Sequence, residues 1–399
     1  MDAASAGVSA KLEAVSGSGE MRRADLRCPG GDGDGNMEAA MKRLVIFFDG
    51  TWSLPVIETN VHRLYEITAP ADAAHVVQLK KYWNGVGTRW MEVLRGGILG
   101  FGTGRNICEA YEWLQANYED GDHVFILGFS RGAYSARSLA GMISRCGLLQ
   151  SNATTTVAQI YQRYAVKNEE LVADSRRIPI HFLGVWDTVG ELGVPWGNFP
   201  GVSRSTILFH NTSPSPRYRN MFHALAIDEN RSEFEPTLWT AGEEDGFTLQ
   251  PDQRLEQCWF AGSHSDVGGG GLDSGLARIT LAWMRDRATE CGLAFTRKIE
   301  VQADDHSSLI RDSFATFMLG AYRLVRFNRR YFRPIGQATV QTPKGQVHPL
   351  NETIDASVFR RWRDDPTYRT SKNLVDWAQQ RGLDPADIHE TIPARATTP

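Results

Sequence analysis

The chain has 399 residues, of which 42% are hydrophobic and 23% are charged, a composition typical of a folded globular protein and not of a disordered one. Its 43 Lys and Arg against 47 Asp and Glu give a formal charge of −4, too near balance to indicate nucleic acid as a partner. The five cysteines are scattered and never spaced Cys-x-x-Cys, which argues against a disulfide framework and a cysteine-based zinc site.

The N-terminal region, residues 1–40, is rich in Gly, Ala, Ser and Asp. Such a composition cannot bury enough apolar area to offset the entropy lost on ordering, so we predict a disordered tail. The region contains no apolar run of a signal peptide, and no stretch of the chain approaches the roughly 20 apolar residues of a membrane span. We therefore expect no transmembrane segment, and a protein that is cytoplasmic or exported without a cleavable signal peptide.

Five short apolar runs are predicted to be buried strands. In chain order they are Arg43–Phe48, His75–Leu79, His123–Leu127, Ile180–Trp186 and Gln257–Ala261. The intervals between them can each hold a helix, and amphipathic spacing predicts helices over 105–118 and 276–292. Alternation of strands and helices is the pattern of a mostly parallel, doubly wound α/β sheet flanked by helices.

Two segments depart from this alternation. Residues 192–220 contain four prolines and several large apolar side chains, and we interpret them as a lid-like excursion, although ordinary packing is the favoured explanation of the apolar residues. After about Pro334 the pattern weakens, apart from a short helix predicted near 373–381. We therefore expect a catalytic domain over 41–335 and a small, partly irregular C-terminal extension over 336–399.

The strongest catalytic signal is Gly128-Phe-Ser130-Arg-Gly132, which directly follows a predicted strand and precedes a helical stretch at 133–144. Alone, the pattern is also typical of a glycine turn with a capping serine, but in this context it indicates the nucleophile elbow of the α/β-hydrolase fold. The glycines are needed because a sharp turn leaves no room for side chains beside the serine. We therefore predict an α/β-hydrolase-like serine hydrolase with Ser130 as nucleophile.

A serine hydroxyl is a weak nucleophile, so a histidine must take its proton and an acid must orient that histidine. In this fold the chain order is serine, acid, histidine. Asp187 ends the predicted strand 180–186, and His264 lies in a glycine-rich loop, 262–271, just after another strand. Both positions fall at the carboxyl edge of the sheet, where such folds assemble their sites. We predict Asp187 as the acid and His264 as the base, against the simpler roles of a capping aspartate and a packed loop histidine.

Other titratable residues compete for these roles. His210 and His223 are rival bases, but the first lies in the irregular excursion and the second is predicted to lie in the middle of a helix. Asp266 is a second candidate acid, but a carboxylate two residues from His264 on a tight turn rarely reaches the imidazole face opposite the serine. We expect Asp266 to brace the glycine-rich loop.

The oxyanion formed during acyl transfer needs hydrogen-bond donors. The Arg131 N–H follows the nucleophile and is the first candidate donor. The second usually comes from the turn after an earlier strand, which here is Asp49-Gly50-Thr51, so we assign it to the backbone of Gly50 or Thr51. Asp49 is expected to tie loops together, because a free carboxylate there would oppose the charge of the transition state. No metal and no cofactor are expected.

Six motifs together resemble, in order, the catalytic domain family of type VI secretion phospholipase effectors (lipase effector family 1-like), an α/β-hydrolase domain family of otherwise unknown function. The motifs lie at residues 47–52, 84–88, 128–133, 185–190, 223–231 and 262–270. The resemblance covers roughly residues 42–290 and implies the triad Ser130, Asp187 and His264. It suggests phospholipase A1 or A2 activity, with a lipid substrate and peripheral contact with a membrane. The segment Asp228–Arg231 is interpreted as an internal ion-pair and capping element.

Several alternatives stay open. A carboxylesterase or thioesterase would act on a soluble ester with the same residues, and a hydrolase fold can also be retained as a binding module. A phosphatase of the haloacid-dehalogenase type has a strand followed by Asp-Gly-Thr, but residue 47 is Phe, so Asp49 itself would have to be the nucleophile. Metal-dependent hydrolysis through Asp49, Asp187, His264 and Asp266 is a further alternative.

Overall fold

In the computed structural model the chain divides into two units, residues 1–40 and 41–399, and all described residues belong to the second. The described residues are 41–50, 58–85, 101–166, 171–189, 213–242, 248–271, 275–337, 339–342 and 345–395. The predicted tail, Thr51 and residues 192–212 of the predicted lid lie outside them. No helix among the described residues is long and apolar enough to span a membrane.

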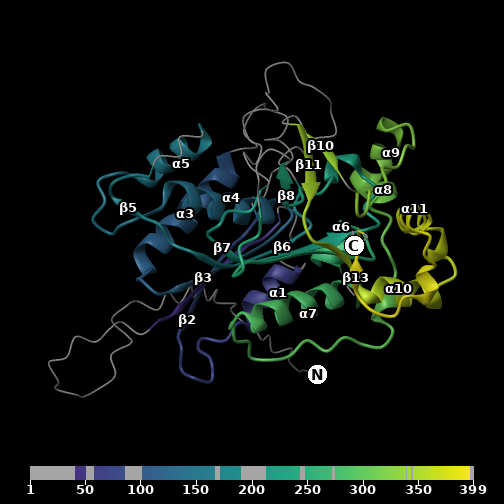
Figure 1. The fold of residues 1–399 in the computed structure, drawn as a ribbon, viewed down its shortest axis with the longest axis horizontal. Coiled ribbons are helices and arrows are strands. Elements are labelled where there is room, and N and C mark those ends of the chain that lie inside the picture. The colour runs from purple at the N-terminus through teal and green to yellow at the C-terminus, as the bar shows by residue number, and fades with distance from the viewer. Residues whose placement is uncertain are drawn as a thin grey trace, which may run out of the picture. The chain divides into compact units, whose positions relative to one another are not determined.

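Within the described part of unit 41–399, eight strands form one central sheet in the order β13-β12-β9-β7-β6-β3-β1-β2 (Figure 1). These strands are β1 (Arg43–Phe48), β2 (Gln78–Trp83), β3 (His123–Phe129), β6 (Ile180–Trp186), β7 (Tyr218–Ala226), β9 (Arg254–Phe260), β12 (Glu352–Ile354) and β13 (Ile392–Pro393). Every neighbouring pair is parallel except β12 with β13. The predicted mostly parallel α/β sheet is confirmed.

Two small sheets accompany the central one. They are formed by β8 (Thr240–Gly242), β10 (Val340–Thr342) and β11 (Gly345–Pro349), and by β4 (Leu148–Leu149) and β5 (Ser175–Arg176). The α-helices are α1 (Asn60–Ile67), α3 (Phe101–Asn117), α4 (Arg131–Cys146), α5 (Val157–Ala165), α6 (His264–Gly268), α7 (Gly275–Glu290), α8 (Ser313–Thr316), α9 (Ala321–Val325), α10 (Ala356–Asp364) and α11 (Lys372–Arg381). Short 3-10 turns are η2 (Ser232–Phe234), η3 (Asp305–Ser307), η4 (Phe317–Gly320), η5 (Tyr368–Thr370) and η6 (Pro385–Asp387).

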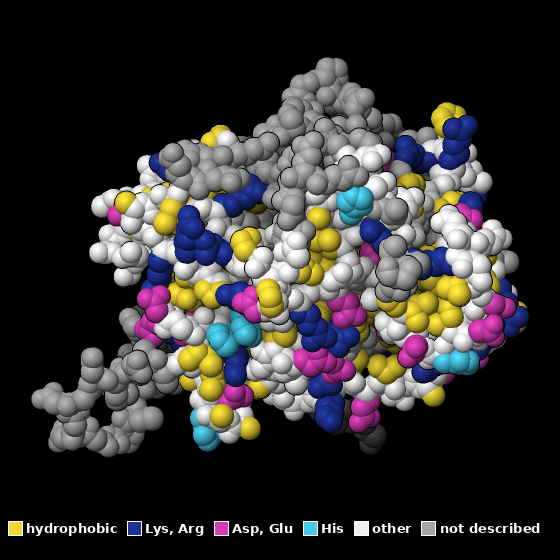
Figure 2. Space-filling model, in the orientation of Figure 1, with side chains coloured by type: hydrophobic (Ala, Val, Ile, Leu, Met, Phe, Trp, Pro, Cys, Tyr) yellow, Lys and Arg dark blue, Asp and Glu magenta, His cyan; other side chains and the backbone are white. Residues whose placement is uncertain are grey.

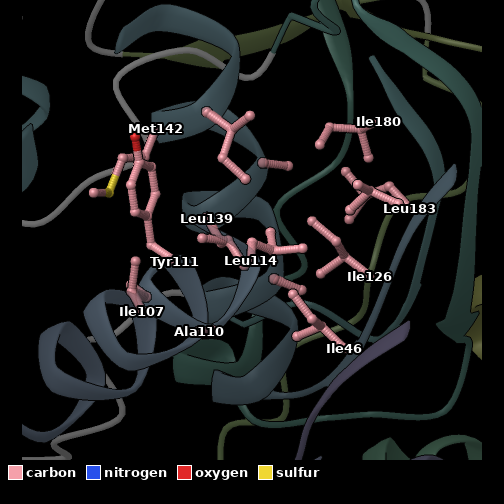
Figure 3. Packing of buried hydrophobic residues seen from close by; sticks show 14 of the residues in the cluster. Ile46, Ile107, Ala110, Tyr111, Leu114, Ile126, Leu139, Met142, Ile180 and Leu183 are labelled. Atoms are coloured by element: carbon pink, nitrogen blue, oxygen red, sulfur yellow. The ribbon is translucent and has the colours of Figure 1, made fainter. Parts of the chain in front are cut away.

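Both faces of the sheet are covered by helices, which explains why its strands are continuous apolar runs. In β1 every side chain is buried, and alternate residues enter different cores. Ile46 packs on one face against α3 and α4, where Leu114 and Leu139 meet strand side chains such as Ile126 (Figure 3). Phe47 packs on the other face against α1 and α7. The sheet is therefore doubly wound, as predicted.

Two strand predictions need correction. The second strand runs from Gln78 to Trp83 and not over 75–79, because residues 71–77 form a turn in which Asp72 accepts hydrogen bonds from the Ala74 and Val76 N–H groups. The prediction that His223 lies in a helix was wrong. It lies in β7, a central strand between β6 and β9, because a short apolar run cannot be distinguished as helix or strand by periodicity alone.

The C-terminal residues extend the same sheet. Strand β12 pairs parallel to β9, and α10 and α11 pack in a third hydrophobic core that contains Trp259, Phe359 and Trp377. The Trp259 Nε1–H donates to Glu352 at 2.9 Å. The helix predicted near 373–381 is confirmed as α11.

Candidate active site

The turn between β3 and α4 has the geometry of a nucleophile elbow. Ser130 occupies it with φ 58° and ψ −122°, a left-handed conformation that is unusual for a residue with a side chain. A Cβ atom on Gly128 would lie 2.4 Å from the Gly132 carbonyl oxygen, and one on Gly132 would lie 2.2 Å from the Phe48 carbonyl oxygen. Both positions therefore require glycine, for the steric reason that the motif indicated.

The structure brings Ser130, Asp187 and His264 into contact. His264 Nε2 lies 2.8 Å from Ser130 Oγ, and His264 Nδ1 lies 2.6 Å from Asp187 Oδ2. The three residues follow β3, β6 and β9, so the carboxyl ends of three parallel strands meet at this site. Asp187 is fully buried and His264 nearly so. In this arrangement the imidazole can take the serine proton while the carboxylate holds the other ring nitrogen.

Two aromatic rings hold the His264 imidazole in place. The Phe129 ring lies 4.7 Å from it, centroid to centroid, and the Phe234 ring lies edge-on at 5.1 Å. Phe129 reaches this position only because residue 268 is glycine, since a Cβ atom there would lie 1.9 Å from the Phe129 ring. Gly268 thus explains one glycine of the 262–271 loop.

The backbone at His264 is fixed by the start of α6. Ser263 and Asp266 form a capping box in which the Ser263 N–H and hydroxyl donate to Asp266 Oδ2, at 3.0 and 2.8 Å. The Arg311 N–H donates to the same oxygen at 3.0 Å. Asp266 is fully buried and its contacts connect the loop to a later segment of the chain.

Arg333 is a site residue that the sequence did not indicate. Its guanidinium binds both oxygens of Asp187, with Nη1–Oδ1 at 2.6 Å and Nη2–Oδ2 at 2.9 Å. Nη1 also donates to the Ala226 carbonyl at 2.7 Å, and Nη2 donates to the Phe234 carbonyl. The side chain is fully buried. No local motif marks Arg333, which lies beyond the resembling region in a segment with several other arginines.

The charge of Asp187 depends on these partners. Burial raises the pKa of the Asp187 carboxyl, but the positive charge of Arg333 and the hydrogen bonds from Arg333 and His264 outweigh burial and hold the pKa below its usual range. The Ala226 N–H also donates to Oδ1, at 3.1 Å. These contacts favour the ionised form of the carboxylate and fix its orientation.

The segment Asp228–Arg231 is hydrogen-bonded to the backbone around His264. Glu229 and Arg231 form a buried ion pair with Nε–Oε1 at 2.8 Å, and the His264 N–H donates to Glu229 Oε2 at 3.2 Å. Burial raises the pKa of Glu229, but Arg231 outweighs it and the pKa stays below its usual value. Asp228 accepts a hydrogen bond from the Gly262 N–H at 2.7 Å. These contacts agree with the interpretation of the segment as an internal ion-pair and capping element.

Asp49 and Gly50 lie beside the nucleophile. Asp49 accepts hydrogen bonds from the Tyr82 hydroxyl at 2.5 Å, the Thr59 hydroxyl at 2.7 Å and the Gly50 N–H at 2.6 Å. Burial raises the pKa of Asp49. A Cβ atom on Gly50 would lie 3.3 Å from Ser130 Cβ, so its backbone is close to the nucleophile, but its N–H donates to Asp49 in this conformation.

Thr51 is not among the described residues, and the oxyanion donors Arg131, Gly50 and Thr51 stay a prediction.

The rival base His223 is engaged elsewhere. Its Nε2 accepts a hydrogen bond from the Thr188 N–H at 3.1 Å, and its Nδ1 lies 3.4 Å from Gln257 Oε1. Burial lowers the pKa of His223 to about 3, so the ring is neutral at physiological pH. The other rival, His210, lies outside the described residues.

Within the described ranges no group of three or more His, Cys, Asp or Glu side chains could hold a metal ion. Of the four residues in the metal-dependent alternative, Asp187 and His264 bind each other, whereas Asp49 and Asp266 have other partners. Asp49 binds Tyr82 and Thr59, and Asp266 binds the Ser263 backbone and hydroxyl.

Residues 42–287 match the family described as "T6SS, Phospholipase effector Tle1-like, catalytic domain". The chain is 28% identical over 235 residues to the uncharacterized protein YEL023C of Saccharomyces cerevisiae, a match that covers 50% of this chain and 33% of the yeast protein. The matched part thus spans about a third of the length of that curated relative.

Two solved structures are similar at low sequence identity. One is an uncharacterized protein from Pseudomonas aeruginosa, with a TM-score of 0.39, 19% identity and coverage of 72% of this chain and 50% of that one. The other is the Tle1 effector bound to the VgrG spike from the type 6 secretion system, with a TM-score of 0.43, 16% identity and coverage of 73% and 80%.

Proposed function

The chain belongs to the type VI secretion phospholipase effector Tle1-like catalytic-domain family, and from this membership we propose that it hydrolyses carboxylic ester bonds of phospholipids through an acyl-enzyme on Ser130. The observation that carries the proposal is the position of His264, whose two ring nitrogens lie 2.8 Å from Ser130 Oγ and 2.6 Å from Asp187 Oδ2. This relay is what a serine hydroxyl needs to act as a nucleophile.

The proposed reaction has two halves. Ser130 Oγ attacks the ester carbonyl carbon while its proton moves to His264 Nε2. The tetrahedral intermediate then expels the alcohol, which takes that proton, and the acyl group stays on Ser130. Water repeats the sequence on the acyl-enzyme, releases the fatty acid and restores the hydroxyl. Asp187 keeps the Nδ1–H of the imidazole oriented and stabilises the imidazolium that forms in each half.

Arg333 has a positioning role in this proposal. A buried carboxylate without a partner is protonated at higher pH and loses its hold on the imidazole. The two hydrogen bonds from Arg333 to Asp187 favour the ionised form and fix the plane of the carboxylate. Arg333 thus supports the base without touching the substrate.

The chemistry of this site supports an A1 or A2 type of phospholipase. In a phospholipid the carboxylic esters, and not the phosphodiester, can transfer an acyl group to a serine, so the cleaved bond joins a fatty acid to glycerol and the phosphodiester is left intact. The expected products are a free fatty acid and a lysophospholipid.

Active-site labelling followed by product analysis tests the proposal. A fluorophosphonate probe should label the native protein and the Ser138→Ala variant, whose substitution removes a buried serine from the same helix, α4. Ser130→Ala should not be labelled, and its turnover of phospholipid and ester substrates should fall by on the order of 10⁶ in kcat. Ester hydrolysis that persists in purified Ser130→Ala would refute the assignment. Turnover of soluble esters without any phospholipid cleavage would favour the carboxylesterase or thioesterase alternative.

A further inference from the structure

The tip of α9 presents apolar and basic side chains together to solvent. Leu324 is 80% exposed and Phe327 is 86% exposed, and Arg323 and Arg329 beside them are also exposed. We call these four residues the α9 tip. Figure 2 shows hydrophobic and basic side chains protruding together where Figure 1 places α9. Exposure of two large apolar side chains at one protrusion is unfavourable in water unless something covers them.

The segment that contains the α9 tip has basic but no acidic side chains. From Ser313 to Asn351 the sequence contains no Asp or Glu, although the whole chain has a formal charge of −4. Acidic side chains of neighbouring elements are occupied at the base of the tip, where Arg326 pairs with Glu233 at 3.3 Å and Arg330 pairs with Asp312 at 2.5 Å.

Arg323 and Arg329 form no salt bridge within the described residues, so the outer part of the tip carries positive charge.

The tip is connected to the wall of the active site through aromatic contacts. The Phe234 ring that packs on His264 lies 5.9 Å from the Phe317 ring, and Phe317 lies 5.5 Å from Tyr322 of α9. The Tyr322 hydroxyl donates to Glu233, which anchors α9 to the η2 turn. Contacts between aromatic rings thus connect the α9 tip to the residues around His264.

We propose that the α9 tip is the surface with which this protein docks on an anionic phospholipid bilayer. The proposal rests on the proposed phospholipase function and names how the site reaches its substrate. Exposed Leu and Phe side chains enter the boundary between headgroups and acyl chains, which removes their apolar area from water. Arginine side chains are attracted to negatively charged lipid headgroups, an interaction that weakens with salt over a Debye length. Charge complementarity thus selects an anionic bilayer over a neutral one.

Vesicle sedimentation tests docking separately from catalysis. All variants carry Ser130→Ala, so that lipid is not consumed, and are mixed with vesicles of phosphatidylcholine alone or with added phosphatidylglycerol. The parent should sediment with the anionic vesicles and much less with the neutral ones. Leu324→Asp with Phe327→Asp, or Arg323→Gln with Arg329→Gln, should weaken partitioning by about 20-fold.

The control is Val166→Asp, which places a charge on another exposed apolar residue (74% exposed) just after α5, on the opposite side of the view in Figure 1. It should bind vesicles like the parent. With Ser130 restored, both tip variants should hydrolyse a soluble p-nitrophenyl ester at the native rate, which shows that their fold and site are intact.

Equal vesicle binding by the parent and the tip variants, or equal binding to neutral and anionic vesicles, overturns the docking proposal. Absence of soluble-ester and phospholipid hydrolysis by the native protein overturns the proposed function instead.

Discussion

Arg333 lies fully buried against Asp187, with its two terminal nitrogens 2.6 and 2.9 Å from the two carboxylate oxygens. The two residues are 146 positions apart in the chain. The pair resolves a conflict in the site, because a carboxylate that is fully removed from water would otherwise become neutral. The pair also brings Arg333, which follows the family-matched region 42–287, into direct contact with the triad residue Asp187.

Removal of Arg333 should shift the pH dependence of both stability and activity. Asp187 has a lowered pKa in the folded state, so its contribution to stability is present above the ordinary carboxyl pKa, about 4, and is lost as the pH falls below that. In Arg333→Met burial dominates, the pKa rises, and the loss of stability and of kcat/KM should move to higher pH. We also expect destabilisation of about 3–5 kcal/mol at neutral pH, because one partner of a buried pair is missing.

Arg333→Lys is the matched control, since it keeps the charge but not the two-pronged contact. Arg333→Lys should recover part of the stability and of the kcat/KM that Arg333→Met loses at low pH. Melting temperature and kcat/KM measured across pH 4–8 check both variants; identical pH profiles for native protein and Arg333→Met would exclude the positioning role.

The base and the acid of the triad should respond differently to substitution. His264→Ala should reduce kcat nearly as severely as Ser130→Ala, because no other group can take the serine proton. Asp187→Asn should retain more activity, with a loss on the order of 10⁴, but should also lower the melting temperature because Arg333 is left without its counter-charge. Steady-state kinetics beside thermal melts checks the order; a milder loss for His264→Ala than for Asp187→Asn contradicts it.

Asp266→Asn should act mainly on stability. Its carboxylate closes the capping box at Ser263 and accepts the Arg311 N–H, and loss of a cap typically costs about 1 kcal/mol. Asp384→Asn is a control at an exposed cap, that of η6. Strong loss of activity in Asp266→Asn with an unchanged melting curve would move the acid role from Asp187 to Asp266.

Gly268→Ala should disturb the histidine through Phe129. The new methyl group would lie 1.9 Å from the Phe129 ring, so the ring must leave its place against His264. We expect lower kcat and a lower melting temperature. Phe129→Ala in the same chain removes the clash, so the double variant should be more stable than the sum of the two single effects predicts. Additive effects would mean that the two residues do not meet.

Chelation separates the triad from the metal-dependent alternatives. The proposed mechanism uses hydrogen-bonded groups of the chain alone, so dialysis against EDTA should leave ester hydrolysis unchanged. Loss of activity that is restored by Mg²⁺ or Zn²⁺ would support a metal on Asp49 or Asp187.

Local sequence patterns were sufficient to predict most of the central strands and the elbow. A parallel sheet covered on both faces needs short continuous apolar strands, so β1, β3, β6 and β9 could be recognised from their residues. The elbow could be recognised because its steric demand falls on two residues close in sequence, Gly128 and Gly132, each two positions from Ser130. Asp187 and His264 could be selected because each directly follows such a strand.

Only the tertiary structure decided what surrounds these residues. Arg333 reaches Asp187 from a distant segment, and a contact of that kind leaves no periodicity or spacing in the sequence. His223 was mistaken for a helical residue because β7 owes its strand conformation to hydrogen bonds with β6 and β9, which its own residues do not encode. The chain alone thus determined where the proposed reacting groups lie along it, and long-range packing determined their charge and their orientation.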